Sequence, residues 1–137
     1  MTVFVIDACA MIAFLNNEAG AQVIESLLRQ AMSASVTLFM HKVNLLELYY
    51  GVYRESGDLL AQQTIAKVTA LPIHVIHELT DAVFYKAGRL KALYKISLAD
   101  SIAAAEAQIR NCALVTADHH ELDPLDQNQE LKFLWFR

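Results

Sequence analysis

Four acidic residues, far apart along the chain, stand where carboxylates could hold a metal ion. Asp7 interrupts the apolar run TVFVIDACAMIAFL, Glu47 ends NLLE, Asp100 ends SLAD and Asp118 lies in LVTADHH. Carboxylates brought close together repel one another unless protons or a cation neutralise them. Oxygen-only ligands suit Mg²⁺ or Mn²⁺, which bind phosphate oxygens and activate water. The residue types therefore point to metal-assisted hydrolysis of a phosphate ester.

The acids can meet only if the elements that carry them converge. Short apolar stretches rich in β-formers predict strands at 3–6, 36–40, 71–76, 112–116 and 131–136. Apolar residues recur at helical spacing over 24–31, 83–94 and 98–109. Strands that alternate with helices favour an α/β fold, with a parallel sheet sandwiched between helices. Pro72 at the start of the third strand predicts that this strand lies at an edge.

In such a fold the carboxyl ends of the strands and the starts of the helices share one edge of the sheet, where ligands bind. Asp7 ends the first predicted strand, and Asp118 lies two residues beyond the fourth. Glu47 and Asp100 are predicted in the first turns of two helices. All four acids are therefore expected at this edge. Which strands are neighbours does not follow from these patterns.

Each acid also has a purely structural interpretation. Asp7 and Asp118 could cap the short helices that follow them. The pairs with capping-box spacing are Asn44 with Glu47 and Ser97 with Asp100. Capping and metal binding are compatible. The convergence of four acids from distant segments favours a site.

The composition sets limits on the class of protein. The chain has 137 residues, of which 55% are hydrophobic and 19% charged, so we expect a single domain over 1–137. The net charge of −4 disfavours a broad basic face for nucleic acid, so such a role must be local or assisted by metal. Cys9 and Cys112 form no disulfide framework, which favours a cytoplasmic location. No apolar run has the length of a membrane span, and no membrane role is expected.

Four segments together resemble the PIN-domain ribonucleases, and the length and layout resemble the VapC-type toxins of prokaryotic type II toxin–antitoxin pairs. The segments are IDACA, NLLELYYG, ISLADSIAAAEA and LVTADHHEL. The resemblance runs over about residues 3–136. It implies a three-layer α/β/α domain with five parallel strands in the order 3-2-1-4-5. In that order Asp7 and Asp118 would lie side by side.

The resemblance also implies an activity. The family hydrolyses single-stranded or looped RNA, with tRNA and rRNA as candidate targets, and leaves a 5′-phosphate and a 3′-hydroxyl. Asp7, Glu47, Asp100 and Asp118 would hold Mg²⁺ or Mn²⁺, and Thr116 would orient a carboxylate or a water. A homodimer is expected. So is a cognate antitoxin protein that covers the site.

Two features depart from or extend the family pattern. The family often has Ser, Thr or Asn two residues after the first acid, where this chain has Cys9. A thiol is a weak hydrogen-bond partner, and we do not expect Cys9 to act as a nucleophile. A fifth acid sometimes follows the fourth. The candidates here are Glu121, Asp123 and Asp126, and the sequence does not choose among them.

Further polar residues have two interpretations each. The cations of segment 86–95, Lys42 and Arg54 could contact RNA, although the segment also suits the solvated side of a helix. Tyr49, Tyr50 and Tyr53 could stack on bases, but helix packing or a dimer surface is favoured. His119 and His120 are expected to be exposed or capping residues.

Other classes of protein fit less well. Nucleotide-binding domains are disfavoured because the chain lacks their glycine motifs. Haloacid-dehalogenase-like phosphatases carry a second Asp where this chain has Cys9, and receiver domains carry an acid pair that is absent here. The remaining alternative is a PIN-like module that binds RNA or protein without cleaving it.

Overall fold

The computed structural model describes residues 2–137, in which five strands and seven helices alternate. Met1, the first residue of the domain predicted over 1–137, lies outside the described residues. In chain order the elements are β1 (Thr2–Ile6), α1 (Ala8–Leu15), α2 (Ala21–Met32), β2 (Val36–His41), α3 (Lys42–Ser56), α4 (Asp58–Thr69), β3 (His74–Ile76), α5 (Asp81–Leu93), α6 (Leu98–Arg110), β4 (Ala113–Thr116), α7 (His119–Gln127) and β5 (Lys132–Trp135).

The five strands form one parallel sheet in the order β3-β2-β1-β4-β5, which confirms the predicted α/β class and strand order. The central strand β1 pairs with β2 on one side and with β4 on the other. Ile6 lies opposite Val115 in the β1–β4 register. The residues that follow, Asp7 and Thr116, are therefore brought side by side where the two strands end.

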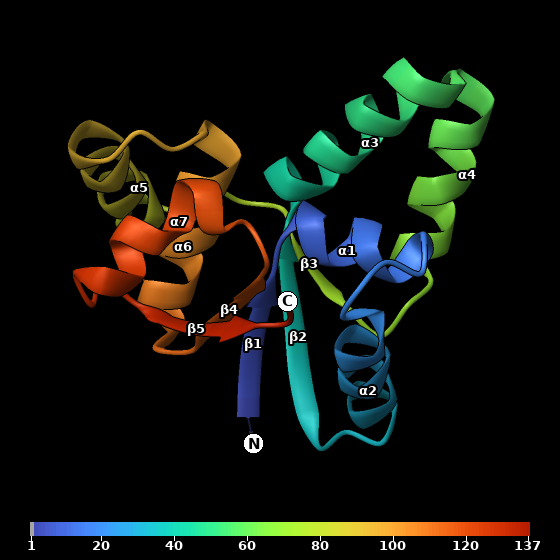
Figure 1. The fold of residues 1–137 in the computed structure, drawn as a ribbon, viewed down its shortest axis with the longest axis horizontal. Helices are drawn as coiled ribbons and strands as arrows, with labels where there is room; N and C mark the ends of the chain where they lie inside the picture. Colours follow the sequence, from blue (N-terminus) through green and yellow to red (C-terminus); the bar gives the residue numbers. More distant parts are fainter. Residues whose placement is uncertain (1) are drawn as a thin grey trace.

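Helices cover both faces of the sheet, and each face has its own hydrophobic core. Helices α1 and α2 pack on one face, and α5, α6 and α7 on the other (Figure 1). Met11, Leu38 and Met40 are buried in the first core, and Leu90, Leu114 and Leu122 in the second. Helices α3 and α4 form a hairpin that stands out from the body beyond the carboxyl ends of the strands (Figure 1).

Side-chain caps start the helices at the edge where the strands end. The side chain of Asp7 accepts a hydrogen bond from Ala10 N–H at 2.9 Å and begins α1. Asp118 accepts from Glu121 N–H at 3.3 Å and begins α7. Ser97 accepts from Asp100 N–H at 3.1 Å and begins α6. The structural interpretation of these residues is therefore confirmed, and each cap satisfies a helix N–H that would otherwise lack a partner.

The start of α3 differs from the prediction. His41, the last residue of β2, accepts a hydrogen bond from Val43 N–H at 3.0 Å, so the helix begins at Lys42 with no intervening loop. Asn44 lies inside the helix and is fully buried, so it does not cap it. The capping box predicted for Asn44 and Glu47 is wrong, and Glu47 lies in the second helical turn rather than the first.

Strand β3 is shorter than the predicted 71–76. It begins at His74, because Pro72 has no N–H and Ile73 N–H donates to Leu71 C=O at 2.7 Å in a tight turn. The strand lies at the sheet edge, as Pro72 predicted, and His74 is exposed. It is therefore not buried on both faces.

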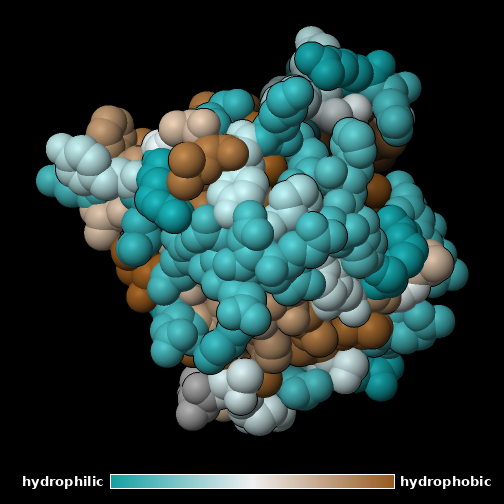
Figure 2. Space-filling model, turned by 60° about the vertical axis from the view of Figure 1, so that its left-hand side comes forward, coloured by the Kyte–Doolittle hydropathy of each residue, from teal (hydrophilic) through white to brown (hydrophobic). Residues whose placement is uncertain are grey.

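The helices of the described chain are too short or too polar to span a membrane. Within residues 2–137, none of the helices combines the length and the apolar character needed to cross a bilayer. On the face shown in Figure 2, hydrophobic residues gather in separate patches between broad hydrophilic areas.

Candidate metal site

Asp7 is the most deeply buried acid at the edge where β1 and β4 end. Its carboxylate is 1% exposed. The oxygen Oδ1 caps α1, while Oδ2 is buried and has no hydrogen-bond partner among residues 2–137. Burial without a partner costs free energy for any polar atom, and most for a charged one. A bound cation is a partner of the kind that Oδ2 lacks.

Three more acids form a tight group beside Asp7. Asp100, Asp118 and Glu121 each offer a carboxylate oxygen, and these oxygens all lie within 4.8 Å of one another. They come from α6, from the end of β4 and from α7, respectively. Oxygen ligands at such separations fit a single hard divalent cation.

Glu47 faces the same group from α3. Burial raises the pKa of its half-buried carboxyl, and the nearby charges of Glu121 and Asp118 raise it further. Glu47 does not belong to the group within 4.8 Å. All four predicted acids thus gather at one edge of the sheet, with Glu47 at the rim.

Glu121 is the acid that the sequence left unresolved among three candidates. It is within the group, whereas Asp123 accepts a hydrogen bond from the His119 ring at 2.7 Å and Asp126 accepts one from the Trp135 indole at 2.9 Å. Glu121 follows Asp118 by three residues, so the first turn of α7 carries both carboxylates to one side.

Glu121 also completes the cap of α6 from another helix. In a capping box the residue at the position of Asp100 would accept a hydrogen bond from Ser97 N–H. Here Glu121 accepts that bond at 3.0 Å. The carboxyl of Asp100 is thereby released from the cap and hydrogen-bonds Glu121 instead.

The pKa values of Asp7 and Asp100 lie above those of isolated carboxyls. Burial raises the pKa of Asp7 to about 7, and the charges of Glu47 and Asp118 add to this effect. Burial also raises the pKa of Asp100, followed by its hydrogen bond to Glu121, while the same bond lowers the pKa of Glu121. The pair therefore favours sharing a single proton. Such mutual repulsion is the condition that a divalent cation relieves.

This burial predicts how the stability of the metal-free protein depends on pH. An Asp carboxyl in water has a pKa of 3.8, whereas the pKa of Asp7 in the fold is about 7, so the folded state binds this proton more tightly than the unfolded state. The resulting stabilisation is complete below about pH 4 and is lost as the pH rises to about 7. At about 1.4 kcal/mol per pKa unit the loss approaches ~4 kcal/mol.

Comparison of wild type with Asp7→Asn isolates this contribution from those of the histidines. In EDTA, urea unfolding should show the variant becoming the more stable by an amount that grows between about pH 4 and 7. Mg²⁺ should reduce the difference. A difference that does not change with pH would contradict the prediction.

Thr116 and Cys9 flank Asp7. The Thr116 hydroxyl accepts a hydrogen bond from Asp118 N–H at 3.1 Å. Its own side-chain hydrogen bond to the Asp7 carboxyl favours the ionised carboxylate and so lowers the pKa of Asp7. Burial raises the pKa of the Cys9 thiol to about 11, and the charge of Asp7 raises it further. The thiol therefore stays protonated near neutral pH and is a poor nucleophile.

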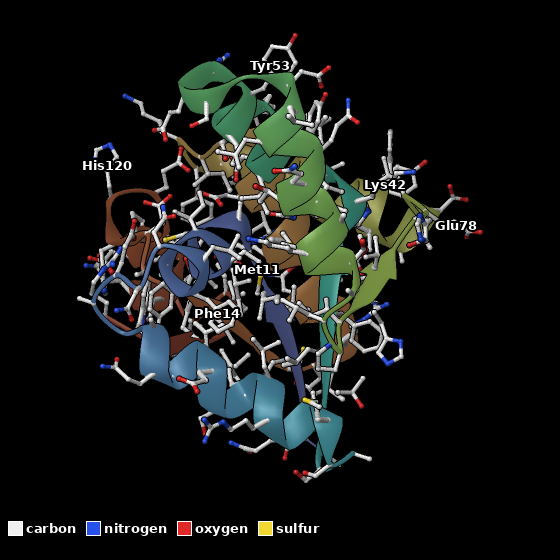
Figure 3. The ribbon with its side chains drawn as sticks, turned by 90° about the vertical axis from the view of Figure 1, so that its right-hand side faces the viewer. Met11, Phe14, Lys42, Tyr53, Glu78 and His120 are labelled. Carbon is white, nitrogen blue, oxygen red and sulfur yellow. The ribbon has the colours of Figure 1, made fainter. Side chains whose placement is uncertain are left out.

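The histidines and tyrosines have structural contacts of their own. The His119 ring stacks on Trp135 at 3.9 Å and bonds Asp123, and Figure 3 shows His120 pointing outward from the body. Tyr49 donates to Asp58 at 3.1 Å and lies 5.9 Å from the Tyr53 ring, so these side chains take part in the packing of α3 and α4.

Among residues 2–137, neither Arg54 nor Lys42 forms an ion pair with an acid of the site. Arg54 lies over the Tyr50 ring, with 5.0 Å between the guanidinium carbon and the ring centroid. Lys42 and His120 lie on opposite sides of the molecule in the view of Figure 3.

Comparisons with solved structures find the same fold. VapBC2 from Rickettsia felis, bound to a DNA fragment from its promoter, has a TM-score of 0.76 at 17% identity, over 98% of this chain and 99% of that one. DNA-bound VapBC from Salmonella typhimurium has a TM-score of 0.73 at 15% identity, over all of both chains (100% and 100%). A toxin–antitoxin complex from Klebsiella pneumoniae has a TM-score of 0.63 at 15% identity, over 100% of this chain and 98% of that one.

The sequence itself gives the family. No curated protein matches the chain. The PIN domain family matches residues 4–126, a span that contains Asp7, Glu47, Asp100 and Asp118. With that match over most of its length and with the sheet order and acidic edge described above, the chain belongs to the PIN domain family.

Proposed function

We propose that this protein is a metal-dependent endoribonuclease and the toxin of a type II toxin–antitoxin pair. The observation that carries the proposal is the convergence of five carboxylates from four separate segments on one edge of the sheet, with Asp7 Oδ2 buried and unpartnered among them. A structural role alone explains the caps but not five mutually repelling acids at one edge.

The residues divide the work by their position and rigidity. Asp7 and Asp118 follow adjacent strands and offer ligands from the most rigid part of the fold, and Asp100 and Glu121 complete the oxygen set. Bound Mg²⁺ or Mn²⁺ would supply the positive charge that draws the RNA phosphate and activates water for attack on phosphorus. Thr116 orients Asp7, and Glu121 orients Asp100 through their shared hydrogen bond. Ligand carboxyls must lose their protons, so metal affinity rises with pH.

Two kinds of protein partner accompany this proposal. Several related structures are named as VapBC or toxin–antitoxin complexes, which supports an antitoxin partner. A cytoplasmic location is part of the proposal. A groove of about 620 Å³ between α5 and α6 exposes Phe84, Tyr85 and Leu98, and exposed apolar side chains of this kind suit a homodimer contact.

The test is cleavage of a panel of structured RNAs, tRNA and rRNA fragments included, by protein free of antitoxin. Cleavage is expected with Mg²⁺ or Mn²⁺ and should stop in EDTA. Metal binding without cleavage of any RNA would favour the alternative of a catalytically silent module. Absence of metal binding by calorimetry would overturn the proposal.

A matched pair of variants on α7 tests which acids belong to the site. Glu121→Gln keeps an oxygen for Ser97 N–H but removes the charge beside Asp100, and we expect cleavage to fall about 10–100-fold. Asp123→Asn removes the same charge two residues away, outside the group, and should leave cleavage within about twofold of wild type. Equal losses in both variants would contradict the assignment of Glu121.

A further inference from the structure

A polar pocket of about 640 Å³ opens directly beside the acidic group. The segment 91–97, which is the last turn of α5 and the loop to α6, forms most of its lining, and Glu121 forms the rest. Glu121 also belongs to the group with Asp100 and Asp118. The pocket and the acidic group therefore share Glu121.

Hydrogen bonds hold the segment in one shape. The ammonium of Lys91 donates to Ile96 C=O at 2.8 Å, and Ser97 N–H donates to Glu121 at 3.0 Å. Tyr94 donates from its hydroxyl to Glu130 at 2.6 Å, which fastens the middle of the segment to the loop after α7. The pocket is therefore formed before any ligand binds, which lowers the ordering cost of binding.

The cations of segment 86–95 are not equivalent. Arg89 pairs with Glu130 at 3.0 Å, and Lys91 is used within the segment. Lys95 lines the pocket, is exposed and makes no hydrogen bond or ion pair within the described chain. Lys95 therefore offers an unpaired positive charge in a pocket whose lining it shares with Glu121, one of the acids.

We propose that this pocket holds the nucleotide next to the cleaved phosphodiester of a single-stranded RNA, and that Lys95 binds the backbone phosphate of that nucleotide. The inference rests on the proposed nuclease function. An RNA strand that approaches the acids is repelled by every carboxylate that remains ionised. An unpaired cation in the pocket that Glu121 also lines offsets this repulsion and sets the path of the strand. The polar lining, with backbone groups and Ser97, suits a sugar and base edge rather than an apolar ligand.

The test measures RNA binding separately from cleavage. A fluorescently labelled short single-stranded RNA of mixed sequence is titrated with Asp7→Asn protein in Mg²⁺, by anisotropy, at a series of salt concentrations. Added to this background, Lys95→Gln should weaken binding about five- to tenfold and reduce the slope of log K against log salt by about 0.7, the value for one phosphate contact in a single strand.

Lys86→Gln, in the same background, is the matched control. Lys86 is an exposed cation on α5 that does not line the pocket, so its removal changes the net charge equally. It should leave the affinity within about twofold. Thermal melting of each variant checks that the fold is retained.

Three results would overturn the inference: no RNA binding by the background protein, an unchanged affinity and slope in Lys95→Gln, or an equal loss in both lysine variants. Its failure is distinct from that of the proposed function. If wild type cleaves RNA in a metal-dependent way but Lys95→Gln does not change RNA binding, only the pocket inference fails. If Lys95→Gln alone weakens RNA binding but wild type cleaves no RNA, the proposed nuclease function fails and the pocket remains an RNA-binding site.

Discussion

Asp7→Asn is expected to lower the rate of metal-dependent RNA cleavage by about 10³-fold or more while the protein remains folded. Asn keeps the side-chain oxygen that accepts from Ala10 N–H, so the cap of α1 survives. The substitution replaces the buried, unpartnered Oδ2 with a neutral group and removes the negative charge that a cation needs. Asp7 directly follows the central strand and is buried, so the substitution acts at the centre of the site.

The measurement is cleavage of the most sensitive RNA of the panel, by wild type and variant, with Mg²⁺ and with Mn²⁺. Calorimetry on the same samples should show weakened metal binding. Asp81→Asn, an exposed acid in the first turn of α5, is the control and should retain full activity. A variant that keeps metal binding and cleavage near the wild-type level would rule out Asp7 as a ligand.

The largest effect on stability is expected from Gly20→Ala. Gly20 has a φ of +87°, and a Cβ atom there would lie 2.2 Å from Phe136 C=O oxygen and 2.7 Å from its ring. The left-handed backbone costs a residue with a side chain about 1–2 kcal/mol, and the collision with backbone adds about 1–3 kcal/mol. We expect a total loss of about 2–5 kcal/mol and a melting temperature lower by about 10 °C.

Gly57→Ala separates the two costs. Gly57 has the same φ of +87°, with a ψ of 177° that is essentially restricted to glycine, but no atom lies within 4 Å of the added Cβ. It should lose only the conformational part, about 1–3 kcal/mol. Both variants are compared by urea unfolding at one pH. Equal losses would show that the end of the chain does not dock rigidly against the turn between α1 and α2.

This docking also bears on the site. Arg137 donates to Ala19 C=O at 3.1 Å and pairs with Glu18 at 3.4 Å, so the chain end is held against the turn that follows α1. Helix α1 begins at Asp7. Gly20→Ala should therefore weaken metal binding as well, since it loosens the helix that Asp7 caps.

Most of the architecture could be predicted from local patterns. Strand and helix signals are properties of neighbouring residues, so the predicted strands at 3–6, 36–40, 112–116 and 131–136 lie within about a residue of those observed. The prediction makes the third strand too long, because the apolar pattern continues through Pro72 and the turn at Ile73, where strand pairing has not yet begun. Glu47 was placed one turn too early, because the imidazole of His41 serves as a cap, and His is a rare capping residue.

The sequence by itself determined that Asp7, Glu47, Asp100 and Asp118 lie at one edge of an α/β sheet, since strand ends and helix starts are encoded locally. Only the tertiary structure decided which of the three later acids joins them, because the distance between α6 and α7 depends on how the two helices pack on the same face of the sheet. It also decided that Glu121 completes the cap of α6, that Asp100 therefore turns to the other acids, and that Lys95 lines the pocket without a partner among residues 2–137. These are contacts between segments far apart in the chain, and no local pattern encodes them.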